Sequence, residues 1–181
     1  SEGQAMKIAV IGAGPGGLFA ALAARRHNIS VDVFEKRQVG AGIVCGECIF
    51  DSLKIFPRPG KGLLRPIHEI IMQGRHGYNF AIGRYRPLWM MDRKTWQRDL
   101  ARQVRDAGAV VHENAAVRPG DLAQMRGSYD WIIDASGAPC VTSRLYSFQA
   151  AYFHEYLLAY QFLLGGDFSA LMPRLKFAFF E

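Results

Sequence analysis

The sequence predicts an α/β fold built on a doubly wound, mostly parallel sheet, and three observations predict it. A short β-branched run at 7–11 is followed by the glycine pattern Gly12-Ala-Gly-Pro-Gly-Gly17 and then by an alanine- and leucine-rich stretch. A second apolar run at 31–34 ends at Glu35. Further strand-like runs alternate with a helical pattern later in the chain. This β-α-β order with long connections is typical of parallel sheets.

The glycine pattern lies between a predicted strand and a predicted helix, which is the context in which G-x-G-x-x-G binds a dinucleotide in a Rossmann-like domain. We expect Gly12 to permit a tight turn, Gly14 to let backbone approach a pyrophosphate, and Gly17 to allow close helix–strand packing. Pro15 suits a first helical turn. With Gly16 it opens a helix whose free N–H groups face the phosphates.

Glu35 lies 18 residues after Gly17, close to the spacing of about 20 at which an acid binds an adenosine ribose. Lys36 and Arg37 follow it directly, and cations there could meet a 2′-phosphate. The carboxylate favours an unphosphorylated ribose. We therefore predict a dinucleotide with an AMP half at this place, with Lys36 beside it.

Composition and charge exclude several classes of protein. The 181 residues suffice for one α/β core or slightly more. The net charge is +6, but the cations are spread out, which favours an anionic cofactor over nucleic acid. Three cysteines make no disulfide framework, and we expect a cytoplasmic protein. Glycines and a proline interrupt the apolar stretch 8–24, so it is not expected to span a membrane.

The remaining patterns predict, in chain order, a short helix at 49–56, a hairpin from 67–72 to 79–82, a helix at 92–108, a strand at 109–113 and a strand within 130–137. The helix at 92–108 has the clearest pattern. Asp92 can cap its start, Gly108 lies just past its end, and Trp96, Leu100 and Val104 form an apolar stripe.

We expect a nucleotide-binding domain at 6–145, with the hairpin inserted at about 64–90, and the start of a substrate-domain sheet at 146–181. Residues 1–5 resemble an expression remnant ahead of Met6. The aromatic tail ends in a strand-like run, which predicts an incomplete sheet. That last strand is expected to find a partner, and a dimer through it is one way.

The sequence resembles the p-hydroxybenzoate hydroxylase class of flavoproteins and, within it, the geranylgeranyl reductase family. Three features carry the resemblance: the glycine pattern with Glu35, the segment Met91-Asp-Arg-Lys-Thr-Trp-Gln-Arg-Asp-Leu100, and the segment Trp131-Ile-Ile-Asp-Ala-Ser-Gly-Ala-Pro-Cys-Val-Thr-Ser-Arg144. It implies that the first of these binds FAD, that Arg93 lies close to the flavin dinucleotide, and that Asp134 and Gly137 belong to a second cofactor fingerprint. It further implies backbone contacts between Val117 and adenine.

The same resemblance implies an activity. Reduced FAD would deliver hydride to an isoprenoid-type or similar apolar double bond, with NADPH or a ferredoxin-like protein as the electron donor. An apolar substrate of this kind also implies peripheral contact with a membrane. Two rivals stay open: a flavin monooxygenase that acts on an aromatic ring, and a non-catalytic remnant that binds a nucleotide.

The cysteines of Cys45-Gly46-Glu47-Cys48 admit four interpretations. By the resemblance, Cys45 lies on the substrate side of the flavin, where a thiol could donate a proton. Cys45 and Cys48 could instead form a redox pair or half of a zinc site, although no second ligand pair stands at the required spacing. They could also be two small buried thiols. The five histidines form no recognisable metal-binding pattern, and we expect no metal.

Overall fold

The computed structural model describes residues 6–51, 60–74, 76–81, 88–146, 162, 165–171 and 174–178. The chain forms two compact units. Residues 1–42 and 97–158 make the first unit, and residues 43–96 and 159–181 make the second.

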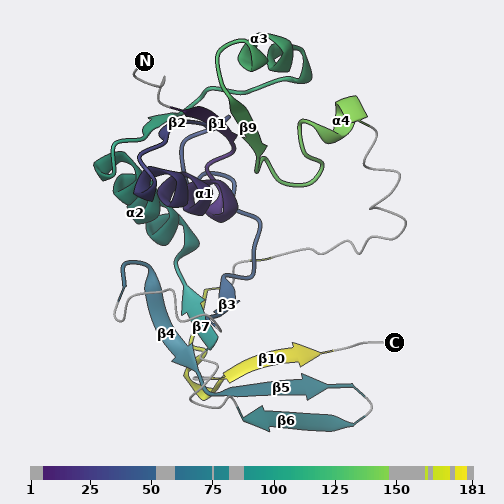
Figure 1. The fold of residues 1–181 in the computed structure, drawn as a ribbon. Helices are drawn as coiled ribbons and strands as arrows, with labels where there is room; N and C mark the ends of the chain where they lie inside the picture. Colours follow the sequence, from purple (N-terminus) through teal and green to yellow (C-terminus); the bar gives the residue numbers. More distant parts are fainter. Residues whose placement is uncertain are drawn as a thin grey trace. The chain divides into compact units, whose positions relative to one another are not determined.

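The first unit contains a four-stranded parallel sheet in the order β8-β2-β1-β9 (Figure 1). Its strands are β1 (Lys7–Ile11), β2 (Ser30–Phe34), β8 (Val110–His112) and β9 (Trp131–Asp134). The predicted parallel α/β fold is confirmed, because these strands pair in parallel. Each strand coincides with a run that the sequence assigned to a strand. Strands β1 and β2 are the two central strands, and every residue of β1 after Lys7 is buried.

Helix α1 (Pro15–Arg26) packs against β1 and β2, and Figure 1 draws α2 (Arg93–Asp106) beside it. The Arg25 side chain of α1 donates to the Ala107 carbonyl just past α2, at 2.8 Å. The connections that follow contain η1 (Pro119–Asp121), α3 (Leu122–Arg126) and α4 (Ser143–Tyr146).

The predicted signals of α2 are confirmed. The Asp92 carboxylate accepts hydrogen bonds from the Thr95 N–H at 2.9 Å and the Thr95 hydroxyl at 2.6 Å, which is side-chain capping of a helix start. Gly108 adopts a φ of +88° just past the last turn. The apolar stripe of Trp96, Leu100 and Val104 is buried.

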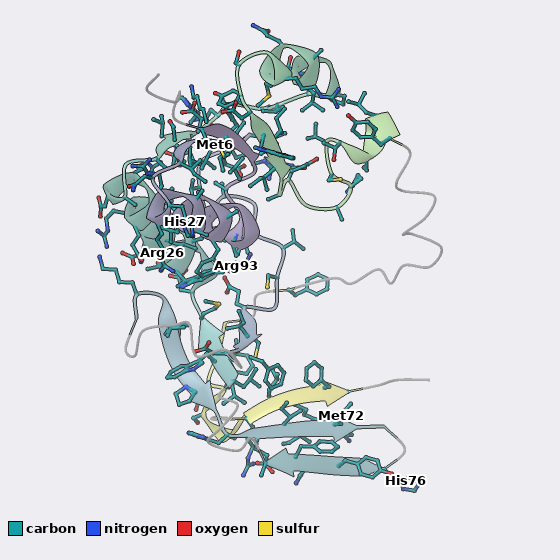
Figure 2. The ribbon with its side chains drawn as sticks, in the orientation of Figure 1. Met6, Arg26, His27, Met72, His76 and Arg93 are labelled. Atoms are coloured by element: carbon teal, nitrogen blue, oxygen red, sulfur yellow. The ribbon has the colours of Figure 1, made fainter. Side chains whose placement is uncertain are left out.

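The second unit contains two three-stranded sheets, in the orders β3-β7-β4 and β10-β5-β6. The strands are β3 (Cys48–Phe50), β4 (Leu63–Ile67), β5 (Glu69–Gln73), β6 (Gly77–Ala81), β7 (Leu88–Met91) and β10 (Arg174–Ala178), and a single turn, η2 (Ser169–Leu171), precedes the last of them. The predicted hairpin is confirmed as the antiparallel pair of β5 and β6. Figure 2 places Met72 on the first of these strands and His76 at the turn between them.

The structure departs from the sequence prediction at the start of the predicted helix 49–56. Ile49 and Phe50, predicted to begin a helix, belong to β3 and pair with β7; residues 52–56 of that prediction lie outside the described residues. The second unit, at 43–96 and 159–181, holds the predicted hairpin together with the tail. Strand β10 pairs with β5 in parallel, which gives the C-terminal strand a partner within its own chain.

The predicted strand-like residues at 150–161 also lie outside the described residues. In the part of the chain that the structure describes, no helix is long and apolar enough to cross a bilayer.

Candidate functional site

A tight bend connects β1 to α1. Gly12 adopts a φ of +97° there, a region in which a side chain is strained. A Cβ at Gly12 would also lie 2.5 Å from the Ala135 carbonyl oxygen. Glycine therefore allows both the turn and the close approach of β1 to the loop after β9.

The other glycines of the bend fall into two kinds. A Cβ at Gly17 would collide with the Gly12 carbonyl oxygen and lie 3.2 Å from Val10 Cγ1, so this glycine brings α1 onto β1. Among the described residues, no heavy atom lies within 4 Å of a Cβ built at Gly14 or Gly16. Gly14 is the N-cap and Pro15 the first residue of α1. The bend therefore has an open side at a helix N-terminus, where backbone N–H groups favour anions.

Two side chains hold Ala13 at the centre of the bend. The Glu35 carboxylate accepts the Ala13 N–H at 2.9 Å, and its other oxygen accepts the Arg37 N–H at 3.1 Å. The buried Gln97 amide donates to the Ala13 carbonyl at 2.7 Å. Glu35, at the end of β2, thus points toward the bend as the sequence predicts, and the bend is fixed from both sides.

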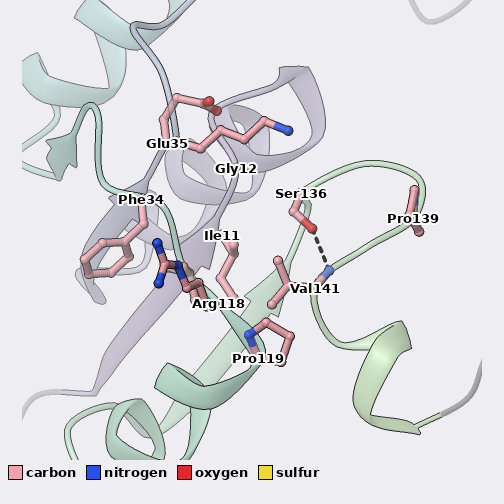
Figure 3. Close-up of a pocket in the computed structure, with 11 residues that line it drawn as sticks. Ile11, Gly12, Phe34, Glu35, Arg118, Pro119, Ser136, Pro139 and Val141 are labelled. Atoms are coloured by element: carbon pink, nitrogen blue, oxygen red, sulfur yellow. Dashed lines mark hydrogen bonds between the residues drawn. The ribbon is translucent and has the colours of Figure 1, made fainter.

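A pocket of about 240 Å³ opens beside this bend (Figure 3). Four of the predicted cofactor residues line it: Gly12, Glu35, Lys36 and Val117. The other lining residues were not predicted: Ile11, Phe34, Arg118, Pro119, Ser136, Pro139 and Val141. Most of them follow the carboxyl ends of parallel strands, where α/β sheets bind ligands. That rule is the signal that could have found the Ser136–Val141 loop.

Asp134 and Gly137 lie in the loop after β9. One Asp134 oxygen accepts the N–H and the hydroxyl of Ser136, at 3.0 and 2.6 Å, and the other accepts the Thr142 N–H at 2.6 Å. The Ser136 hydroxyl also accepts the Val141 N–H at 3.0 Å (Figure 3). Asp134 therefore shapes a loop that lines the pocket. Gly137, at a φ of +97°, is a turn residue outside the lining set.

Burial raises the pKa of the Asp134 carboxyl, but the hydrogen bonds from Ser136 and Thr142 outweigh it and leave the pKa below its ordinary value. We expect Asp134→Asn to lower the free energy of unfolding at pH 7 by about 1–2 kcal/mol, because asparagine keeps one acceptor oxygen. The contribution of the native carboxylate is complete above the unfolded pKa of about 3.9. It is lost as the pH falls through the lower folded-state pKa.

Urea unfolding of both proteins between neutral and acidic pH tests this expectation. The difference between wild type and Asp134→Asn should narrow as the pH drops below about 4. A difference that does not change with pH would contradict an ionised Asp134 as the acceptor.

In the second unit, the Cys45–Cys48 connector is tied to the start of α2. The Glu47 N–H donates to Cys45 Sγ at 3.4 Å, and the Glu47 carboxylate accepts the Arg93 N–H at 3.1 Å. The Glu47 carbonyl accepts the Met91 N–H at 2.9 Å. Two of the predicted site residues, Cys45 and Arg93, are thus linked through Glu47. Arg93, marked in Figure 2, also has a buried Nε without a hydrogen-bond partner among the described residues.

Cys45 and Cys48 are free thiols. Burial, and then the neighbouring Cys45, raise the pKa of the Cys48 thiol, so Cys48 is disfavoured as a thiolate. Within the described ranges, no three His, Cys, Asp or Glu side chains are grouped so that they could hold a metal ion.

Comparison with known proteins identifies the same part of the chain. The family described as the NAD(P)-binding Rossmann-like domain matches residues 10–47, which include the bend and Glu35. A search of curated proteins finds no match.

Solved structures share the fold at low sequence identity. A geranylgeranyl bacteriochlorophyll reductase-like protein from Thermoplasma acidophilum is 21% identical with a TM-score of 0.54, over 64% of this chain and 32% of its own. CmlS, a flavin-dependent halogenase, is 20% identical with a TM-score of 0.59, over 81% and 32%. PqsL from P. aeruginosa, in complex with 2-aminobenzoylacetate, is 16% identical with a TM-score of 0.58, over 80% and 46%. The chain thus spans a third to a half of these proteins.

Proposed function

We propose that this chain is the dinucleotide-binding part of an FAD-dependent oxidoreductase. One observation carries the proposal. The open bend at the start of α1 and the Glu35 carboxylate lie at one site, with Glu35 bonded to the bend itself. Phosphates suit the bend, and a ribose suits a carboxylate at the end of the second strand.

The residues present fit the AMP half of FAD. Gly14 and Gly16 leave space for a pyrophosphate at the N-terminus of α1. Lys36 and Val117 line the pocket next to Glu35. Asp134 would act by holding the Ser136–Val141 loop, since its oxygens are engaged there. The flavin itself supplies the redox chemistry when it is bound, and the chain supplies binding, orientation and exclusion of water.

For the reaction, we favour reduction of an isoprenoid-type double bond. The support is the sequence resemblance, together with the likeness in fold to a geranylgeranyl bacteriochlorophyll reductase-like protein. In this proposal Cys45 donates the proton, and the Cys45–Glu47–Arg93 network fixes the thiol. NADPH or a ferredoxin-like donor supplies electrons.

A flavin monooxygenase acting on an aromatic compound is the second candidate, favoured by the likeness to PqsL in complex with 2-aminobenzoylacetate. NADPH-dependent oxygen consumption that rises with a phenolic substrate would identify it. Substrate-dependent reoxidation of dithionite-reduced protein without oxygen would identify the reductase.

The proposal is tested by titrating the protein with FAD and following flavin fluorescence. Glu35→Ala should weaken FAD binding by about 1–3 kcal/mol, because the ribose hydroxyls lose their half-buried acceptor. This corresponds to roughly a 5- to 150-fold higher Kd.

Glu113→Ala is the matched control. Glu113 also accepts a backbone N–H, from Val39 at 2.6 Å, but it does not line the pocket. We expect its removal to leave the FAD affinity unchanged. A wild-type chain that takes up ADP but not FAD would overturn the flavin assignment and favour a nucleotide-binding remnant.

A further inference from the structure

Arg118 belongs to the pocket wall, although no feature of the sequence singles it out. It lies between Val117 and Pro119, on the connection from β8 to β9, and all three residues line the pocket. Figure 3 shows its guanidinium on the same side of the pocket as the Phe34 ring. Arg118 therefore presents a planar cation to whatever fills this space.

The pocket has the character of a base site. Its volume of about 240 Å³ lies below the range of about 300–1,000 Å³ that whole ligands occupy, so it suits one part of a dinucleotide. Most of its walls are apolar, from Ile11, Phe34, Pro119 and Val141 among others. The polar side chains of the wall are those of Glu35, Lys36, Arg118 and Ser136.

The charges at the pocket are not balanced within the protein. Among the described residues, the Lys36 ammonium and the Arg118 guanidinium form no ion pair. The Glu35 carboxylate is already bonded to the N–H groups of Ala13 and Arg37. Arg37 packs its own guanidinium against Gly42. Arg118 is thus available to a ligand.

The backbone of Arg118 is fixed before any ligand arrives. The Asp121 carboxylate accepts the Arg118 N–H at 2.7 Å, and the Asp121 N–H donates to the Arg118 carbonyl at 3.0 Å. Pro119 follows with its restricted φ. Only the side chain of Arg118 must be ordered when a ligand binds. Binding through Arg118 therefore costs less conformational entropy than binding through a residue whose backbone is also mobile.

We propose that Arg118 stacks its guanidinium on the adenine ring of the bound dinucleotide. The inference rests on the proposed function, which assigns the phosphates to the bend and the ribose to Glu35. Those assignments leave the apolar walls and Arg118 for the base. Guanidinium groups stack on aromatic faces and on nucleobases through both charge and plane.

The test compares Arg118→Ala and Arg118→Lys with the wild-type chain, using FAD, ADP, adenosine and ribose 5-phosphate as ligands in calorimetric titrations. We expect Arg118→Ala to weaken FAD, ADP and adenosine by a similar factor, about 3- to 30-fold, as stacking on a ring predicts. Ribose 5-phosphate, which has no base, should bind as before. Arg118→Lys keeps the charge but loses the plane, so it should behave like Arg118→Ala.

Arg126→Ala is the control, because Arg126 is also an arginine over an aromatic ring, 5.8 Å from the Tyr146 centroid, and lies outside this pocket. It should bind all four ligands as the wild type does. Unchanged FAD and ADP affinity in Arg118→Ala would overturn the inference. Losses confined to phosphate-containing ligands, with recovery in Arg118→Lys, would assign Arg118 to a phosphate and also overturn it. A wild-type chain that binds neither FAD nor ADP would overturn the proposed function itself.

Discussion

Gly17→Ala is expected to destabilise the protein by about 2–4 kcal/mol. The added methyl group would collide with the Gly12 carbonyl oxygen, which is backbone, and press on Val10 Cγ1. Neither neighbour can rotate away, because Gly12 is held in its turn and Val10 is fully buried in β1. The helix must therefore move off the sheet. Thermal and urea unfolding, followed by circular dichroism, measure the loss.

Gly16→Ala is the matched control for this prediction. It adds the same methyl group one residue earlier in α1, where no described atom lies within 4 Å. Alanine also restricts the unfolded chain more than glycine. We expect the free energy of unfolding to stay the same or to rise by up to about 1 kcal/mol. Equal losses in the two variants would show that the packing of Gly17 is not the cause.

Gly14→Val is expected to weaken dinucleotide binding strongly while it changes the stability of the fold little. Gly14 has an extended backbone, with a φ of −70° and a ψ of 175°, which valine adopts readily. Its side chain would point into the open side of the bend, so we expect a stability loss below about 1 kcal/mol. The same side chain fills the space for a pyrophosphate. We expect FAD and ADP to bind at least about 100-fold more weakly, by loss of the phosphate contacts.

Fluorescence titration of the folded variant checks this expectation, with thermal unfolding run alongside. Gly77→Val serves as the control, since Gly77 is another open position and lies in β6 of the second unit. That variant should bind FAD as the wild type does. Retention of tight FAD binding by Gly14→Val would place the phosphates elsewhere.

Local patterns predicted the elements of the first unit well. Strands β1 and β2, helix α1 and helix α2 each have a signal within their own residues, such as the Asp92 cap and the β-branched run before Gly12. The spacing from Gly17 to Glu35 also predicted that the Glu35 carboxylate lies at the bend, where it accepts the Ala13 N–H. These features were predictable because each depends on neighbours in sequence.

Features that depend on distant partners were not predictable in this way. No strand pattern in the sequence marks Ile49 and Phe50, so the sequence predicts a helix there. Their pairing with β7 decides their structure instead. Asp32 lies in an apolar strand, yet it bonds to the Tyr129 hydroxyl at 2.8 Å and to Lys7 at 2.9 Å. No pattern around position 32 indicates those partners.

The residues that line the pocket likewise include some that the sequence could predict and some that it could not. Gly12 and Glu35 have a recognised spacing, whereas Arg118 and Val141 reach the pocket on connections that start at different strands. Tertiary structure alone brings these connections together. Gln97 is a further case, because its side-chain amide donates a hydrogen bond to the Ala13 carbonyl, 84 residues earlier in the chain.

The parallel alignment of β10 with β5 joins residues about a hundred positions apart, whereas β5 and β6 meet across a short turn. During synthesis the hairpin can therefore close as soon as it leaves the ribosome, while β5 keeps one side bare until residues 174–178 emerge. Bare strand edges recruit other chains, and closing so long a loop is slow. The period before the last strand arrives is thus when nascent copies of this protein are most exposed to mutual aggregation.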